Sequence, residues 1–219
     1  IGGILPNFMS NYRTGTGDCI VIEADEYDTA FFDKGPKFLH YTPDAAILTS
    51  VEFDHADIYR DLDHVRDAFG RFVAKIRPGS LLVSVDDDPN VTGLIGLVSC
   101  KQLPYGTRTD SPWQLGETLI QPPLTRFQVI KNGKDYGSFR TRMIGAHNLK
   151  NTLAAIAVAD YLGVTPEKIA DALDSFSGVR RRQEIRGEKR GVIVMDDFAH
   201  HPTAVKETLR AVRSHFSEN

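Results

Sequence analysis

Cysteine is nearly absent from this 219-residue sequence, which contains only Cys19 and Cys100. The two lie far apart and neither belongs to a CxxC pair, so the sequence predicts neither a disulfide framework nor a zinc site. Long hydrophobic runs are missing as well, because no segment approaches the roughly 20 apolar residues of a membrane-spanning helix. These absences favour a protein of a reducing compartment such as the cytoplasm, with no membrane partner.

A strong charge of either sign is also lacking. The 26 Lys and Arg residues and the 29 Asp and Glu residues leave a formal net charge of −3, which argues against nucleic acid as the main partner. An apolar content of 41% suffices for a buried core. A chain of this length holds one large domain, or one domain and part of another.

The most informative feature that is present is an apolar run that ends in acids. Residues 20–22 are Ile-Val-Ile, and four carboxylates follow within six residues, namely Glu23, Asp25, Glu26 and Asp28. Unbroken apolar strands are typical of parallel sheets covered on both faces, and ligands bind beyond the carboxyl ends of such strands. We expect the run of residues 19–28 to be a buried strand that opens onto a charged site, with Glu23 and Asp25 on one side of it and about 6 to 7 Å apart.

A second apolar run ends in the same way. Residues 45–51 lead into Glu52, Asp54, His55 and Asp57. Like charges about 4 Å apart repel by about 4 kcal/mol at an effective dielectric of about 20, so the gathered acids favour a bound divalent cation. Oxygen ligands favour Mg²⁺ or Mn²⁺, and Mg²⁺ usually shares its shell with water and substrate phosphates. The alternative is that the acids are helix caps or solvated turn residues and that His55 is an ordinary loop histidine.

The hydrophobic periodicity predicts alternating strands and helices. Apolar residues at helical spacing predict a helix over residues 61–77, which Pro78-Gly79 ends. Further predicted elements are strands over 81–85 and 101–105 and helices over 89–97, 147–162 and 166–176. This alternation indicates an α/β fold with a mostly parallel sheet flanked by helices.

Strand-like segments predominate between residues 113 and 144. Two of them flank Asn132-Gly133, which is the strongest short hairpin signal, so we expect a small antiparallel sheet. A domain boundary is expected near Gly178, with a central domain over 1–177 and the start of a second, Rossmann-like α/β domain over 178–219. Strands over 182–187 and 191–195 and a helix over 202–216 are predicted for the second part.

Two asparagines at the start of a predicted helix are candidate ligand-binding residues. Asn148 and Asn151 follow Gly145 and lie one turn apart. An amide at a helix start either caps free backbone groups or pairs with the donor and acceptor on the edge of adenine. Both interpretations remain open for Asn148, whereas Asn151 lies too far into the helix to be an obvious cap.

The C-terminal part carries two further motifs. Residues 180–182 are all arginine, and this run is either a solvated linker or a set of guanidinium forks for phosphate. Asp197 follows an apolar strand, where an acid either caps the next helix or binds ribose hydroxyls in nucleotide folds. His200 and His201 come next, as surface residues or as part of the same site.

Taken in order, five segments resemble the muramyl ligase (Mur ligase) family of peptidoglycan synthesis. They are GTGDCIVIEADEYDTAFFD, TSVEFDHADIY, GAHNLKN, RRRQE and DDFAHHPTAV. The similarity spans essentially the whole chain and implies the family's fold, in which a central ATPase-type domain precedes a C-terminal ligase domain. It also implies a bacterial cytoplasmic enzyme that uses ATP and Mg²⁺.

The resemblance assigns roles to seven residues. Glu23 matches the carboxylate that holds Mg²⁺ against the ATP phosphates, and His55 matches a histidine that serves a second metal. His200 matches a residue near the incoming peptide, and we count these three as catalytic. The nucleotide-binding matches are Asn148 and Asn151 for adenine, Arg182 for the phosphates and Asp197 for the ribose.

The implied reaction joins UDP-N-acetylmuramate to the tripeptide L-Ala-γ-D-Glu-meso-diaminopimelate through an acyl phosphate, in peptidoglycan recycling. Tyr27 and Ala56 favour this enzyme over the family member that adds L-alanine, which carries Ser and Met at these positions. Two alternatives come from other classes of protein. EFDHAD and DDFAHH also suit a dinuclear-metal phosphohydrolase, and a nucleotide-binding regulatory module needs no catalysis.

The sequence departs from the family pattern at several points. The family's GxxGKT phosphate loop is absent and would precede Ile1, and the chain lacks a start methionine, so we expect a piece of a longer protein that is inactive alone. Gly70 stands fifteen residues after His55, where several relatives have a carbamylated lysine, and Ser50 stands where relatives often have Asn. Bridging of a second metal, the ranking of peptide substrates and the oligomeric state remain open.

Overall fold

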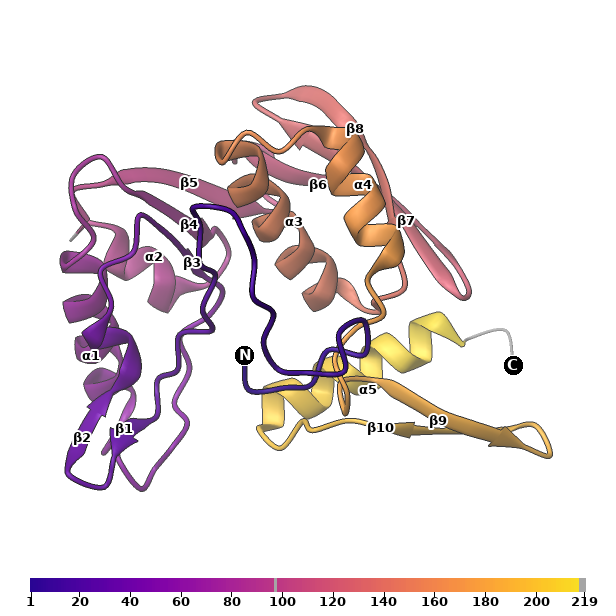
Figure 1. The fold of residues 1–219 in the computed structure, drawn as a ribbon, viewed down its shortest axis with the longest axis horizontal. Helices are drawn as coiled ribbons and strands as arrows, with labels where there is room; N and C mark the ends of the chain where they lie inside the picture. The colour runs from indigo at the N-terminus through magenta and orange to yellow at the C-terminus, as the bar shows by residue number, and fades with distance from the viewer. Residues whose placement is uncertain (97, 217–219) are drawn as a thin grey trace.

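The computed structural model describes residues 1–96 and 98–216 (Figure 1). Most of the predicted elements from residue 61 onward are confirmed to within a few residues, although Leu97, the last residue of one predicted helix, lies outside the described residues. In chain order the elements are β1 (Asp28–Ala30), β2 (Asp33–Pro36), the 3₁₀ helix η1 (Lys37–His40), β3 (Ala45–Leu48), α1 (Leu62–Ala74), β4 (Leu81–Val85), α2 (Pro89–Ile95), β5 (Lys101–Gly106), β6 (Trp113–Gln121), β7 (Leu124–Lys131), β8 (Lys134–Thr141), α3 (Ala146–Tyr161), α4 (Pro166–Ser175), β9 (Glu184–Lys189), β10 (Val192–Asp196) and α5 (Pro202–His215).

A six-stranded sheet in the order β3-β4-β5-β6-β7-β8 forms the centre of the fold. The strands from β3 to β6 are parallel, and β7 and β8 are added antiparallel. The predicted antiparallel region is therefore confirmed, and it continues the parallel sheet through the pairing of β5 with β6. Both Asn132 and Gly133 have positive φ, which is the requirement of the tight turn between β7 and β8.

Helices cover the sheet on two sides, with α1 and α2 on one side and α3 and α4 on the other (Figure 1). Helix α3 packs on the parallel strands, and α4 packs on β8. Strand β4 lies between these layers and is buried along its whole length. This burial explains its unbroken apolar sequence. The predicted apolar face of α1 is buried as well, at Val65, Ala68, Phe72 and Val73. The α/β class expected from the alternation is thus confirmed.

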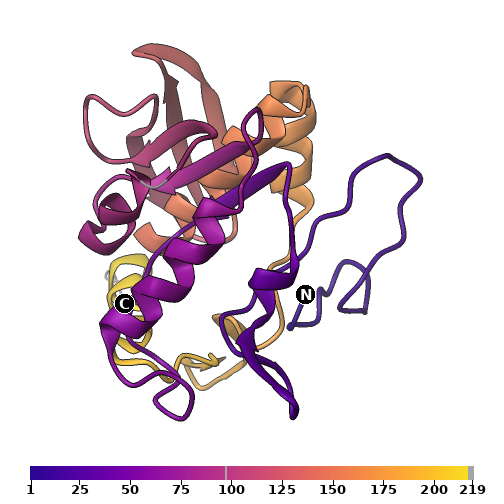
Figure 2. The same ribbon diagram turned by 90° about the vertical axis from the view of Figure 1, so that its left-hand side faces the viewer.

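The buried strand predicted at residues 19–28 is wrong. Residues 19–27 form no strand, and Ile20 and Val21 are 84% and 88% exposed. Figure 2 shows the N-terminal segment as an irregular loop that projects away from the sheet. An apolar run becomes a core strand only where neighbours pair with it and cover both faces. In the described chain β3 is the edge of the sheet, and no strand pairs with residues 20–22.

The C-terminal part consists of the antiparallel pair β9–β10 followed by α5. Helix α5 packs against α3, where Ala211 approaches Gly145 so closely that a Cβ on Gly145 would lie 2.5 Å from the Ala211 Cβ. The N-terminal segment also contacts the connection after α4: the Asn7 amide donates to the Ser175 carbonyl at 2.6 Å and accepts from the Ser177 amide at 2.9 Å. Among the described residues, no helix is both long and apolar enough to cross a membrane.

Candidate functional site

A cavity of about 970 Å³ lies beyond the carboxyl ends of β3 and β4. Its walls also include the start of α3, the segment before β9 and the segment that leads into α5. Six of the seven predicted site residues line it, namely Glu23, Asn148, Asn151, Arg182, Asp197 and His200. The structure therefore brings together residues from the first and last parts of the chain, although their roles remain predictions.

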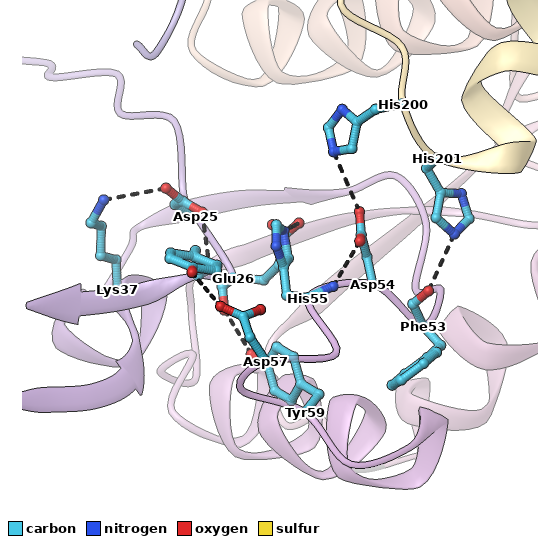
Figure 3. Close-up of polar contacts among 11 residues, drawn as sticks. Asp25, Glu26, Lys37, Phe53, Asp54, His55, Asp57, Tyr59, His200 and His201 are labelled. Atoms are coloured by element: carbon cyan, nitrogen blue, oxygen red, sulfur yellow. Dashed lines mark hydrogen bonds and ion pairs between the residues drawn. The ribbon is translucent and has the colours of Figure 1, made fainter.

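His55 is the predicted site residue that does not line the cavity. It follows Asp54, which does, and its Nε2 lies 3.3 Å from Oε1 of Glu26, another lining residue. The His55 backbone has a φ of +55°, in the left-handed region that non-glycine residues rarely adopt. His55 thus contacts the carboxylate of Glu26, a residue that lines the cavity (Figure 3).

Two tyrosines fix the surroundings of His55. The Tyr27 ring packs edge-on against the imidazole, with centroids 4.8 Å apart, and its hydroxyl donates to Asp57. This hydrogen bond holds the pKa of the Asp57 carboxyl below its usual value and raises the pKa of Tyr27. The Tyr59 hydroxyl donates to the Glu26 carbonyl at 2.7 Å, and burial raises the pKa of Tyr59 to about 12. Tyr27 and Tyr59 therefore join the two acidic segments, a structural role that the sequence pattern does not indicate.

Glu23 and Asp25 do not act as a pair. The Glu23 carboxylate accepts from the Gly2 backbone amide and faces the cavity. Asp25 instead lies 3.2 Å from Lys37 and accepts from the Tyr27 amide. The expectation that both acids share one side of a strand is wrong, because the segment is not a strand.

A chain of hydrogen bonds links Asn148 to Asp197 through Gln183. The Asn148 Nδ2 donates to the Ile144 carbonyl at 2.8 Å and to the Gln183 Oε1 at 3.0 Å. The backbone N–H of Gln183 donates to the Asp197 Oδ2 at 2.9 Å, and the backbone N–H of Ala199 donates to the Asp197 Oδ1. Gln183 therefore connects the middle of the chain with its C-terminal part. Its left-handed backbone, with a φ of +50°, has no signal in the sequence.

The two remaining nucleotide-binding candidates are more exposed. Asn151 faces the cavity from α3 and is exposed. The Arg182 guanidinium also faces the cavity and lies 5.6 Å from the centroid of the Phe198 ring. Arg181 lies over the same ring at 5.1 Å and contacts Asp196, but it is not among the lining residues. Within the arginine run, Arg182 is thus the residue available to a ligand in the cavity.

The loop after β3 contacts the start of α5 directly. His200 Nε2 lies 4.0 Å from Oδ2 of Asp54, and His201 Nε2 lies 3.2 Å from the Phe53 carbonyl (Figure 3). Thr203 Oγ1 donates to Oε2 of Glu52 at 2.6 Å. Sequence reasoning predicted both segments but not their contact, because nothing in the local pattern reports that they meet.

The cavity is strongly acidic. Among the described residues, two permanent cations line it, Lys150 and Arg182, and Lys150 pairs with Asp87. The same part of the chain lines it with eight carboxylates, from Glu23, Glu26, Glu52, Asp54, Asp87, Asp88, Asp197 and Glu207. The described residues nevertheless contain no group of three or more His, Cys, Asp or Glu side chains that could hold a metal ion by themselves. An anionic ligand would therefore need cations of its own to enter.

Comparison with known families identifies two matches. The Mur ligase middle domain matches residues 4–159, and the domain described as "Mur ligase, glutamate ligase domain" matches residues 181–219. The two matches leave residues 160–180 between them, so the division at residue 177 stays a prediction.

Two similar proteins are named for different substrates. The UDP-N-acetylmuramate–L-alanyl-gamma-D-glutamyl-meso-2,6-diaminoheptandioate ligase of Escherichia coli (strain K12) is 41% identical over 215 residues, which are 97% of this chain and 46% of that protein. The UDP-N-acetylmuramate–L-alanine ligase of Salinibacter ruber (strain DSM 13855 / M31) is 38% identical over 218 residues, which are 100% of this chain and 44% of that protein.

A solved structure of a similar protein has the same fold. The murein peptide ligase from Psychrobacter arcticus 273-4 has a TM-score of 0.67 at 32% identity and covers 96% of this chain and 44% of its own. This chain thus spans about half the length of the relatives that it matches. Because the middle-domain match covers most of the chain and the fold agrees, the protein belongs to the Mur ligase family.

Proposed function

We propose that the protein carrying this chain is an ATP-dependent amide ligase, which joins UDP-N-acetylmuramate to the tripeptide L-Ala-γ-D-Glu-meso-diaminopimelate. The observation that carries the proposal is the single cavity lined by six predicted site residues from both matched domains. A ligase needs a nucleotide and an acceptor in one enclosed space, because proximity supplies much of the rate.

Asn148, Asn151 and Asp197 are the proposed contacts for adenosine. Both Nδ2 hydrogens of Asn148 are engaged by Ile144 and Gln183, whereas its Oδ1 has no donor among the described residues. This oxygen is therefore free to accept from the adenine amino group. Asp197 keeps unused lone pairs beside its two backbone bonds, which suits a ribose hydroxyl.

Arg182, Glu23 and Mg²⁺ are proposed to hold the phosphates. The Arg182 guanidinium can bond two phosphate oxygens at once. The acidic lining fits Mg²⁺ bound mainly by phosphate and water, with Glu23 on the cavity lining and His55 held beside the lining residue Glu26. When bound, the metal would neutralise charge that develops during phosphoryl transfer. The protein's own part is to aim the guanidinium and carboxylate groups before the reaction begins.

ATP is proposed to phosphorylate the muramyl carboxylate, and the peptide amine then attacks the acyl phosphate to form the amide and release phosphate. His200, whose side chain is 63% exposed at the cavity, is placed where an incoming amine could approach. Tyr27 and Ala56 support the tripeptide as acceptor. The second candidate acceptor is L-alanine, because a ligase of that name is 38% identical over the whole chain.

A dinuclear-metal hydrolase has less support. Its two motifs do meet, since His200 approaches Asp54, but they assemble no group of three metal-ligating side chains among the described residues. A hydrolytic pair of metals needs such groups from the protein. The named relatives are also ligases.

The proposed function is tested by giving the protein that carries this chain UDP-N-acetylmuramate, ATP and Mg²⁺ with either the tripeptide or L-alanine. We expect equal amounts of ADP, phosphate and amide product with the tripeptide, and little with L-alanine. Exclusive use of L-alanine would contradict the acceptor assignment. Release of phosphate with neither acceptor present would instead favour the hydrolase.

A further inference from the structure

Helix α5 begins without a cap of its own. His201 occupies the N-cap position but makes no side-chain hydrogen bond to the helix, and the first turn contains no acidic residue. The first amide with an intrahelical partner is that of Val205, which bonds to the His201 carbonyl at 2.9 Å. The free amides and the positive end of the helix dipole at this terminus are stabilised by negative charge nearby.

Glu52 brings a carboxylate to this terminus from the other matched domain. Its Oε2 accepts the 2.6 Å hydrogen bond from Thr203 and lies 3.6 Å from Nδ1 of His201. The His201 side chain is 25% exposed and is also fixed by the Phe53 carbonyl on its Nε2 side. Thr203 and His201 of the helix start therefore meet at one carboxylate oxygen of Glu52, and the Phe53 carbonyl holds the other side of the His201 ring.

We propose that Glu52 is a positioning residue, which supplies the missing negative charge to α5 and thereby sets where His200 lies at the cavity. His200 immediately precedes the N-cap, and its imidazole reaches Asp54, two residues after Glu52. Holding His201 and Thr203 against the loop at residues 52–54 fixes the backbone that begins one residue after His200. The inference rests on the proposed function only for the ligand that His200 would face.

The test is hydrogen exchange on the 219-residue chain, read at the amides of residues 205–207. Glu52→Ala is expected to speed their exchange roughly tenfold, since capping interactions at helix starts are worth that order of magnitude. Glu52→Asp keeps the charge and is expected to restore most of the protection. Glu117→Ala, which removes an exposed carboxylate from β6, is the matched control and should leave these amides unchanged.

A second readout follows the His200 imidazole by NMR. Its ring signals should move in Glu52→Ala, recover in Glu52→Asp, and move less in Thr203→Val, which removes only the hydroxyl. If Glu52 acts through Thr203, adding Thr203→Val to Glu52→Ala changes little further. Unchanged exchange and unchanged His200 signals in Glu52→Ala would overturn the proposal.

Binding of ATP with Mg²⁺ separates this inference from the proposed function. If the variants behave as expected while the unmodified protein binds no ATP, the positioning role stands and the nucleotide site fails. If the unmodified protein binds ATP while exchange at residues 205–207 is the same in every variant, the nucleotide site stands and the role of Glu52 fails.

Discussion

Two runs of this chain share one sequence pattern and adopt different structures. Residues 20–22 and residues 45–51 are both apolar or small, and both lead directly into several carboxylates. The second run forms β3 and buries Leu48 and Val51, whereas the first run leaves Ile20 and Val21 almost fully exposed. The difference lies in their surroundings, because β3 pairs with β4 and no strand pairs with residues 20–22 in the described chain.

The acids that follow the two runs also differ in their contacts. Glu52 and Asp54 come after a fixed strand and contact the start of α5 directly. Glu23 and Asp25 come after an unpaired segment and take different partners, the Gly2 amide and Lys37. A pattern of apolar residues followed by acids therefore predicts a buried strand only where neighbouring strands anchor the run, although Glu23 still lines the cavity.

The largest expected effect comes from the same substitution, valine to alanine, made once in each run. Val51 is 1% exposed and Val21 is 88% exposed. Val51→Ala should lower the free energy of unfolding by about 2 kcal/mol, through lost burial and a residual cavity. Val21→Ala should change it by less than about 0.5 kcal/mol. Urea unfolding of both variants provides the measurement, and equal losses would mean that residues 20–22 are packed in solution.

The local sequence pattern predicts most of the fold, because in most segments the apolar residues of the pattern are also the residues that the fold buries. Strand β4 was placed at residues 81–85, where the structure has it, since both of its faces are covered. The strand at residues 19–28 was wrong because its neighbours are not encoded in its own sequence. Gln183 was missed for the same reason: its bonds to Asn148 and Asp197 depend on chain segments that meet only in the folded protein.

The acids of the first run offer the next test. Glu23 lines the cavity, whereas Asp25, two residues later, does not. Glu23→Gln should weaken binding of ATP with Mg²⁺ roughly tenfold, because it removes a charge beside the proposed metal. Asp25→Asn is the matched control and should change the dissociation constant by less than about twofold. Titration calorimetry measures the dissociation constant of each variant. Equal losses of affinity would mean that Glu23 and Asp25 act together.

Asn148 and Asn151 of α3 allow a comparison between a hydrogen-bonded side chain and an exposed one. Asn148→Ala removes two hydrogen bonds, so it should cost about 1 kcal/mol of stability as well as nucleotide affinity. Asn151 is exposed, and Asn151→Ala should weaken ATP binding while changing stability by less than about 0.5 kcal/mol. Thermal unfolding and calorimetry measure the two effects separately. Loss of stability without loss of affinity in Asn148→Ala would leave it a purely structural residue.

The smallest expected effect concerns His147, which precedes Asn148 in the first turn of α3. Burial lowers the pKa of His147, and the nearby carboxylates of Glu207 and Asp197 oppose this only in part. The folded protein therefore disfavours the charged imidazole, while the unfolded chain takes up a proton as pH falls through about 6.5. The stability contribution of His147 is thus fully present above that pH and declines below it. Urea unfolding at pH 7.5 and at pH 5.5 measures this effect. His147→Gln should lose less free energy of unfolding on acidification than the unmodified chain. Equal losses in the two proteins would show that the His147 ring takes up a proton equally well in the folded and unfolded states.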